Sequence, residues 1–209
     1  MVDNRQSAAD AALLTSVRQC TLCAPHLPQH PRPILQCHSS ARILIAGQAP
    51  GHKAHNVGAP FADASGERLR SWLGLTEAQF YNPRLVAILP MGFCFPGTGK
   101  NGDFPPRPEC APTWQQPLLQ MLTKVQLTLV IGHYAQAYHL ADATKTVTET
   151  VANWQQYWPS KVPLPHPSPR NNRWLKQNPW FTETLLPKLQ ARVQQALTAD
   201  NASANRVSS

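Results

Sequence analysis

Six consecutive residues late in the chain, His-Pro-Ser-Pro-Arg-Asn at positions 166–171, bring together a titratable ring, a hydroxyl, a cation and an amide. The two prolines stiffen the backbone, because each fixes its own φ and restricts the residue before it. We expect this segment to hold His166 and Arg170 at the rim of a domain, where they could probe a stack of nucleic-acid bases. The alternative for His166 is a loop histidine whose ring is satisfied by the backbone.

Two further segments that could take part in catalysis or ligand binding lie in the first third of the chain. Gly-Gln-Ala-Pro-Gly at 47–51 directly follows an apolar run, and its glycines permit a tight turn and close approach of a ligand. Gly-Ala-Pro-Phe-Ala-Asp-Ala-Ser-Gly at 58–66 places Phe61, which could stack on a base, and Asp63 just before a predicted helix. Alone, the first is equally typical of an ordinary strand-to-helix loop. The second is equally typical of a helix N-cap region with a core phenylalanine.

The cysteines form another constellation. Cys20 and Cys23 are separated by two residues, and Cys94 and Cys110 by fifteen residues rich in Gly and Pro. Four thiolates converging from distant segments suit either an iron-sulfur cluster or tetrahedral zinc, and spacing does not separate the two. The alternative is a set of unligated buried thiols. Cys37 is left over, and an odd number of cysteines makes a disulfide framework unlikely.

The elements that must position these residues follow from hydrophobic periodicity. Short apolar runs predict buried, mostly parallel strands at 42–46, 85–89, 127–131 and 161–165. Helical spacing predicts helices at 8–17, 65–73, 113–122, 134–140, 148–157 and 182–197, with Ser65 available as an N-cap. This alternation predicts an α/β fold, a three-layer α/β/α sandwich with a short, mostly parallel central sheet. Residues 95–109 show no periodicity and predict an ordered or mobile loop.

The predicted strands end next to the chemically interesting residues. Gly47, Pro90, Gly132 and His166 each come directly after one of the four runs. Ligands of open parallel sheets bind beyond the carboxyl ends of the strands. We therefore expect the glycine turn at 47–51 and the segment at 166–171 to face each other across one cleft.

Length and charge limit the remaining possibilities. The 209 residues suit one domain, which we expect over residues 1–199, with a flexible tail at 200–209. A net charge of +8 favours an anionic partner such as nucleic acid. The N-terminus has no unbroken apolar stretch of the kind found in signal peptides, and no apolar run reaches a membrane span. We expect a cytoplasmic monomer without membrane contact.

The three segments GQAPG, GAPFADASG and HPSPRN together resemble the uracil-DNA glycosylase superfamily over about residues 10–190. HPSPRN is similar to the second motif of the single-strand-selective monofunctional class. GQAPG is more similar to the iron-sulfur-containing thermophilic and bacterial classes, and the whole resembles a bacterial uracil-DNA glycosylase-like branch. The resemblance implies a DNA partner and hydrolysis of the N-glycosidic bond of a flipped-out uracil or related deaminated base in base-excision repair.

The resemblance also implies catalytic roles. His166 would stabilise the negative charge on the departing base, since a donor aimed at a developing anion lowers the barrier. The iron-sulfur class has an acidic residue where this chain has Gln48, and a glutamine cannot act as a base. Asp63 is therefore expected to activate water. Pro90 stands where several classes have a uracil-reading asparagine, so selectivity for uracil is open.

Binding roles follow from the same resemblance. Phe61 matches the position that stacks on the base, and Arg170 the position that wedges into the duplex. Ser168 is expected to bind a phosphate, with Asn171 beside it on the DNA. The edge of the base would be held by the glycine turn, at Gly47, Gln48, Ala49 and Pro50.

The cysteine pattern resembles that of the iron-sulfur glycosylases and implies a structural [4Fe-4S] cluster on Cys20, Cys23, Cys94 and Cys110, with zinc as the alternative. Hydrolysis needs no redox turnover. Two other functions remain open at this level: a non-catalytic protein that binds nucleic acid or damaged bases, and a small-molecule hydrolase using the same cleft.

Overall fold

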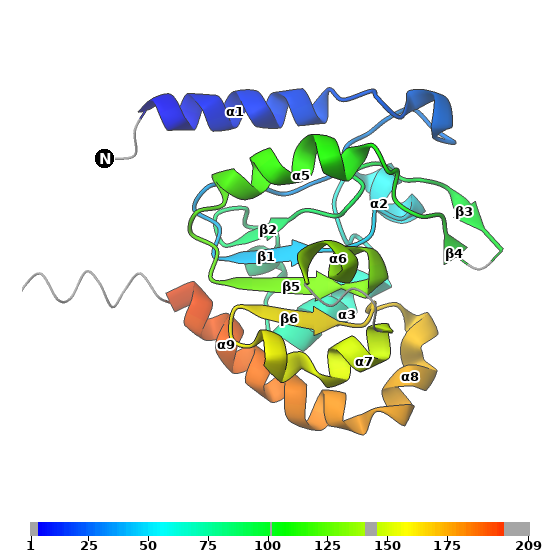
Figure 1. Cartoon of the computed structure of the whole chain (residues 1–209), viewed down its shortest axis with the longest axis vertical. Helices are drawn as coiled ribbons and strands as arrows, with labels where there is room; N and C mark the ends of the chain where they lie inside the picture. Colours follow the sequence, from blue (N-terminus) through cyan, green and yellow to red (C-terminus); the bar gives the residue numbers. More distant parts are fainter. Residues whose placement is uncertain (1–3, 101, 141–145, 199–209) are drawn as a thin grey trace, which may run out of the picture.

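The core of the computed structural model is a parallel sheet whose strands all end on the same side of the molecule (Figure 1). The structure describes residues 4–100, 102–140 and 146–198. Within these residues the central sheet has four strands in the order β2-β1-β5-β6, and every neighbouring pair is parallel. The strands are β1 (Ile43–Ala46), β2 (Val86–Ile88), β5 (Leu127–Ile131) and β6 (Lys161–Leu164). The four predicted strands are thus confirmed.

Helices cover both faces of this sheet (Figure 1). They are α1 (Asn4–Arg18), α2 (His52–Val57), α3 (Ala64–Leu73), α4 (Glu77–Phe80), α5 (Cys110–Met121), α6 (Gly132–His139), α7 (Val147–Ala152), α8 (Asn172–Gln177) and α9 (Leu186–Thr198). Helices α1, α5 and α6 pack against one face, whereas α3 and α9 pack against the other. The predicted three-layer α/β/α sandwich is confirmed.

The strands are largely apolar because both of their faces are buried, and the polar exceptions, Thr128 and Lys161, are only partly buried. Ile43 and Ile45 of β1 point into the cluster formed with α3 and α9. Leu44 points to the opposite side, among residues of α1 and α5. β6 lies at the edge of the sheet, where Pro163 is tolerated because one side of an edge strand makes no ladder hydrogen bonds.

The segment 95–109 is more regular than we predicted. It contains a short antiparallel hairpin of β3 (Thr98–Gly99) and β4 (Gly102–Asp103). Each of these two strands is too short for the alternating pattern of a β-strand to be visible in the sequence. The hairpin extends beyond the carboxyl ends of the central strands (Figure 1).

Helix boundaries also differ from the predictions in places. The N-cap of α3 is Asp63 and not Ser65, because the Asp63 carboxylate accepts the N–H of Gly66. The closing helix begins with a wide π turn at Phe181–Leu185 before α9. Pro187 near the start of α9 has no N–H to donate, which interrupts regular α-helical bonding there. The predicted tail at 200–209 lies outside the described residues.

In the described part of the chain no helix is both long enough and apolar enough to cross a membrane.

Candidate active site

A cavity of about 80 Å³ lies at the carboxyl ends of the central strands. It is lined by Gly47, Gln48, Ala49, Pro50 and Gly51 of the glycine turn and by Phe61, Asp63, Pro90 and His166, all of which the sequence analysis singled out. Roughly 10–15 Å³ suffices for one water molecule, so the cavity can hold several. His166 is solvent-exposed, so the cavity is accessible from the surface. Gly132, expected at the same edge, does not line it.

Hydrogen bonds from the segment that follows β2 shape the glycine turn. The N–H of Met91 donates to the Gly47 carbonyl at 2.8 Å, and the N–H of Gly92 to the Gln48 carbonyl at 2.9 Å. The Gln48 amide Nε2 donates to the carbonyl of Phe104 at 2.9 Å. One of the two Nε2 hydrogens is therefore used by the hairpin, and the other, together with Oε1, is left to meet a ligand.

The second wall of the cavity is formed where the chain enters α3. Asp63 Oδ1 accepts the Gly66 N–H at 3.0 Å as the helix N-cap. Phe61 has a positive φ of 54°, and the Tyr81 hydroxyl donates to its carbonyl at 3.2 Å. A Cβ on Gly66 would overlap that carbonyl, so the turn requires glycine. The N-cap alternative for this segment is thus correct, and both Phe61 and Asp63 still line the cavity.

His166 is held from one side by its own loop. Nδ1 accepts the N–H of Ser168 at 3.2 Å, and the His166 carbonyl accepts the Asn171 side-chain amide at 2.7 Å. Although the residue as a whole is exposed, the protein atoms around the His166 ring on its cavity side desolvate it and lower its pKa below the usual value of 6.5, while the carboxylates of Asp63 and Asp103 act in the opposite direction. The neutral ring with an acceptor at Nδ1 carries its proton on Nε2. The ring is thus satisfied by the backbone on one side only.

The predicted DNA-contacting residues lie beside the cavity and not in its lining. Ser168 Oγ accepts the N–H of Arg170 at 3.2 Å and caps the short turn that follows. The Asn171 side-chain amide is used within the loop, where it donates to the His166 carbonyl. Arg170 is exposed, and its Nη1 lies 2.9 Å from the position that a Cβ on Gly102 would occupy. The loop therefore touches the β3–β4 hairpin.

Sequence reasoning missed two residues of this site. Arg68 on α3 donates from Nη1 to the Ser168 carbonyl at 3.0 Å and from Nη2 to Asn172 Oδ1 at 2.8 Å. Asp103 on the hairpin lines the cavity, and its Oδ1 accepts the Thr98 hydroxyl at 2.7 Å. Neither shows a sequence signal, because Arg68 resembles any exposed helical arginine and Asp103 lies in a segment without periodicity.

The comparison with protein families agrees with this geometry. The model of the uracil DNA glycosylase superfamily matches residues 33–190. The chain belongs to this superfamily. Members of the uracil DNA glycosylase superfamily are typically glycosylase hydrolases that act on DNA, and the resemblance seen in the sequence motifs is confirmed at that level. The match contains the whole cavity and begins after Cys20 and Cys23.

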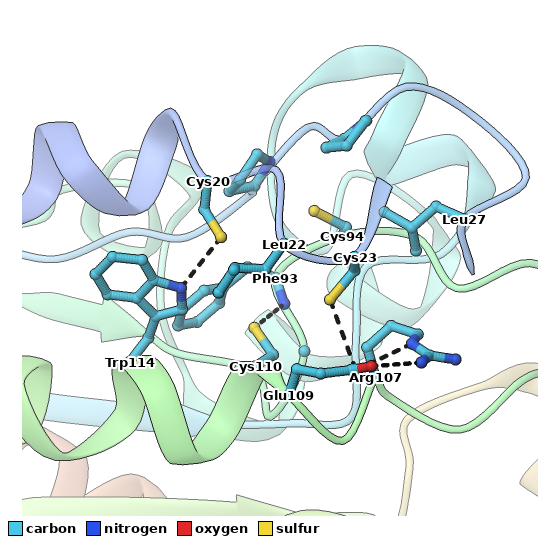
Figure 2. A pocket seen from close by; sticks show the side chains of 13 residues that line it. Cys20, Leu22, Cys23, Leu27, Phe93, Cys94, Arg107, Glu109, Cys110 and Trp114 are labelled. Atoms are coloured by element: carbon cyan, nitrogen blue, oxygen red, sulfur yellow. Dashed lines mark hydrogen bonds and ion pairs between the residues drawn. The ribbon is translucent and has the colours of Figure 1, made fainter. Parts of the chain in front are cut away.

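A second pocket brings together the four cysteines of the predicted metal set (Figure 2). Cys20 and Cys23 follow α1, Cys94 follows β2, and Cys110 opens α5. Figure 2 shows their sulfur atoms around the same space, among apolar side chains such as Leu22 and Leu27. Cys37 is buried elsewhere, against α1 and α5.

Polar groups already point at three of the sulfur atoms (Figure 2). The Trp114 Nε1–H donates to Cys20 at 3.3 Å, and the Phe93 N–H donates to Cys110 at 3.4 Å. The Cys23 thiol donates to Glu109 at 3.7 Å. N–H donors aimed at sulfur are the kind of contact that tunes iron-sulfur sites.

The charge state of the thiols depends on what they bind. Burial raises the pKa of Cys94 to about 11 and that of Cys110 to about 12, so unligated they are neutral at pH 7. Among the described residues no three His, Cys, Asp or Glu side chains are arranged to hold a metal ion. A single zinc needs four sulfurs at about 2.3 Å from one point. In a four-iron cluster each thiolate binds a different iron, so the four sulfurs stand farther apart than around a single zinc.

Proposed function

We propose that this protein is a monofunctional DNA glycosylase that hydrolyses the N-glycosidic bond of uracil or a related deaminated base. The observation that carries the proposal is the shared cavity, in which the glycine turn, Phe61, Asp63 and His166 meet. Membership of the uracil DNA glycosylase superfamily supports the same conclusion. Residues 1–199 would act as one unit and as a monomer.

His166 would stabilise the leaving base. When the bond to C1′ breaks, the electron pair stays with the base, and negative charge develops on its O2. A neutral imidazole with its proton on Nε2 donates a hydrogen bond to that oxygen. Because the loop bond from Ser168 sets the ring before the reaction, little reorganisation is needed. Removing one such donor typically lowers kcat by about 10²–10³-fold.

Asp63 would orient and activate the attacking water. Its Oδ1 is engaged with Gly66, and Oδ2 has no hydrogen-bond partner among the described residues. That oxygen can accept a proton as the water oxygen bonds to C1′. The base leaves as an anion and takes a proton from solvent afterwards. Gln48 cannot fill this role, because an amide is not a base at neutral pH.

Recognition of the base would rest on stacking and on few polar groups. The Phe61 ring lines the cavity and is braced edge-on by Phe80, with ring centroids 6.2 Å apart. Gln48 Oε1 can accept an N–H from the edge of a base, while the backbone of Gly47, Ala49 and Pro50 borders it. Pro90 offers no side-chain hydrogen bond, so we propose a tolerance for deaminated bases other than uracil.

Contact with DNA would come from the exposed rim. Flipping a nucleotide costs a few kcal/mol, which insertion of the Arg170 side chain into the stack can offset. Ser168 retains its hydroxyl proton for a phosphate, and Asn171 stiffens the loop between them. Arg173 and Lys176 on α8 extend the basic surface along the backbone of the strand.

We propose that Cys20, Cys23, Cys94 and Cys110 bind a [4Fe-4S] cluster, with zinc as the alternative. When bound, the cluster would supply a rigid crosslink and no chemistry of the reaction. The four thiolates would connect the segment after α1 to β2 and α5.

The test is an excision assay on oligonucleotides that contain uracil, hypoxanthine or xanthine, followed by alkaline cleavage of abasic sites. We expect strand cleavage with the wild-type protein, and a loss of about 10²–10³-fold in His166→Ala with DNA binding retained. Binding without cleavage of any substrate would support the rival function, a non-catalytic damage-binding protein. Cleavage of free nucleosides without DNA binding would indicate a small-molecule hydrolase.

A further inference from the structure

Phe104 is an exposed aromatic residue next to the cavity. Half of its surface, 51%, is exposed, whereas the phenylalanines of the core are buried. It follows Asp103, which lines the cavity, and its carbonyl accepts the Gln48 amide at 2.9 Å. Its own N–H closes the hairpin by donating to the Gly97 carbonyl at 2.9 Å. The backbone of Phe104 is therefore tied to the cavity wall while about half of the residue remains exposed to solvent.

Two glycines allow one side of the Phe104 ring to pack closely against the hairpin. A Cβ on Gly97 would lie 3.0 Å from ring atom Cδ2, and a Cβ on Gly99 would lie 2.9 Å from Cε1. Only the absence of these side chains lets the ring lie against the hairpin backbone. An exposed ring fixed in this way loses little conformational entropy when it stacks on a ligand.

The surroundings of the ring suit a nucleotide. Phe104 borders a hollow of about 640 Å³ whose wall is formed largely by prolines, Pro25, Pro28, Pro96, Pro105, Pro106 and Pro108, together with His26 and Arg107. This volume falls within the roughly 300–1,000 Å³ of small-molecule sites.

The charge nearby matches a phosphate backbone. Lys100 is exposed at the hairpin turn, and the Arg170 guanidinium, which has no hydrogen-bond partner among the described residues, lies against Gly102 of the same hairpin. The acids of this region are engaged, since Asp103 accepts from Thr98 and Glu109 forms an ion pair with Arg107 at 2.6 Å.

We propose that Phe104 is a stacking platform for a second nucleobase of the bound strand, one that stays outside the cavity. This inference rests on the proposed action on DNA and adds a binding site to it. Since base–aromatic stacking is worth about 1–3 kcal/mol per base, loss of the ring weakens binding roughly 5- to 150-fold. No phosphate contact is lost, so the slope of log K against log salt stays the same.

The experiment compares the dissociation constants of wild type, Phe104→Ala, Phe104→Trp and Tyr138→Ala for a uracil-containing single-stranded oligonucleotide. Tyr138 is the matched control, because it is also an exposed aromatic, at 44%, but does not border this hollow or the cavity. We expect weak binding only for Phe104→Ala, with an unchanged salt slope and near-normal binding by Phe104→Trp. Stacking on Phe104 should change the fluorescence of a 2-aminopurine placed beside the uracil. This change should be lost in Phe104→Ala and kept in the other three proteins.

The outcomes separate the two proposals. If Phe104→Ala binds DNA as tightly as wild type and Tyr138→Ala do, the stacking platform is overturned. That result is expected if the hollow binds a protein partner. DNA binding without base excision by wild type overturns the glycosylase, while the Phe104 comparison still decides the platform. A wild-type protein that binds no DNA overturns both.

Discussion

Arg68 tests whether α3 positions the His166 loop. Its two hydrogen bonds, 3.0 Å to the Ser168 carbonyl and 2.8 Å to Asn172, join segments 100 residues apart in the chain. A hydrogen bond from a charged group contributes about 1.5–3 kcal/mol when it is shielded from water. Arg68 is only partly buried, so we expect Arg68→Ala to lower the free energy of unfolding by about 1–3 kcal/mol in total.

The effect on catalysis should be about as large, in free energy, as the effect on stability. Ser168, whose carbonyl Arg68 holds, also donates the N–H that sets the His166 ring. A displacement of about 1 Å at a reacting group can lower a rate about 10²-fold. We therefore expect the single-turnover excision rate of Arg68→Ala to fall about 10- to 100-fold, with a melting temperature lower by about 2–10 °C.

The matched control is Arg70→Ala, two residues further on the same helix. Arg70 lies over the rings of Phe80 and Tyr81, at 5.7 and 5.8 Å, and makes no described bond to the loop. The Arg70→Ala variant should be somewhat less stable than wild type and should keep the wild-type excision rate. Arg68→Lys should recover part of the rate, since its single ammonium group can still donate to one of the two partners. A wild-type rate in folded Arg68→Ala would refute the positioning role.

Three further predictions concern the two pockets. Asp63→Asn should keep α3 capped, because Asn caps as well as Asp, but should lower the excision rate by about 10²–10⁴-fold; an unchanged rate would remove Asp63 from the mechanism. The lowered pKa of His166 means that folding favours the neutral ring. The contribution of this ring to the free energy of unfolding is complete above pH 6.5 and is lost as the pH falls from 6.5 through the lowered pKa of the folded state. An NMR titration of the ring that gives a pKa of 6.5 or more would contradict the structure. Cys110→Ser should abolish a broad absorbance near roughly 400 nm and lower the melting temperature, whereas Cys37→Ser should leave the absorbance intact; a colourless, zinc-containing wild type would reject the cluster.

Local patterns in the sequence carried much of the fold. The central strands consist mostly of apolar residues buried on both faces, so the runs at Ile43–Ala46 and Leu127–Ile131 could be recognised without any tertiary information. The cavity followed from topology, because parallel strands place their carboxyl ends at one edge and the motifs come directly after those ends. The motifs in their order also identified the superfamily.

Tertiary structure decided what each side chain of the site can still do. Gln48 uses one of its two amide hydrogens on the Phe104 carbonyl, Asp63 caps α3 where Ser65 was predicted to, and the Asn171 amide donates to the His166 carbonyl. These bonds form between particular donors and acceptors brought together by packing, and a hydrogen-bonding residue carries no local sign of its eventual partner.

The sequence alone determined the layers of the fold, the edge at which the site lies and most residues of its wall. Only the tertiary structure brought in Arg68 and Asp103, and placed Phe104 where a second base could stack. The physical reason is the separation along the chain. Hydrophobic periodicity repeats within a few residues and can be seen in the sequence, whereas Arg68 and Ser168 are 100 residues apart and no repeating pattern predicts their contact.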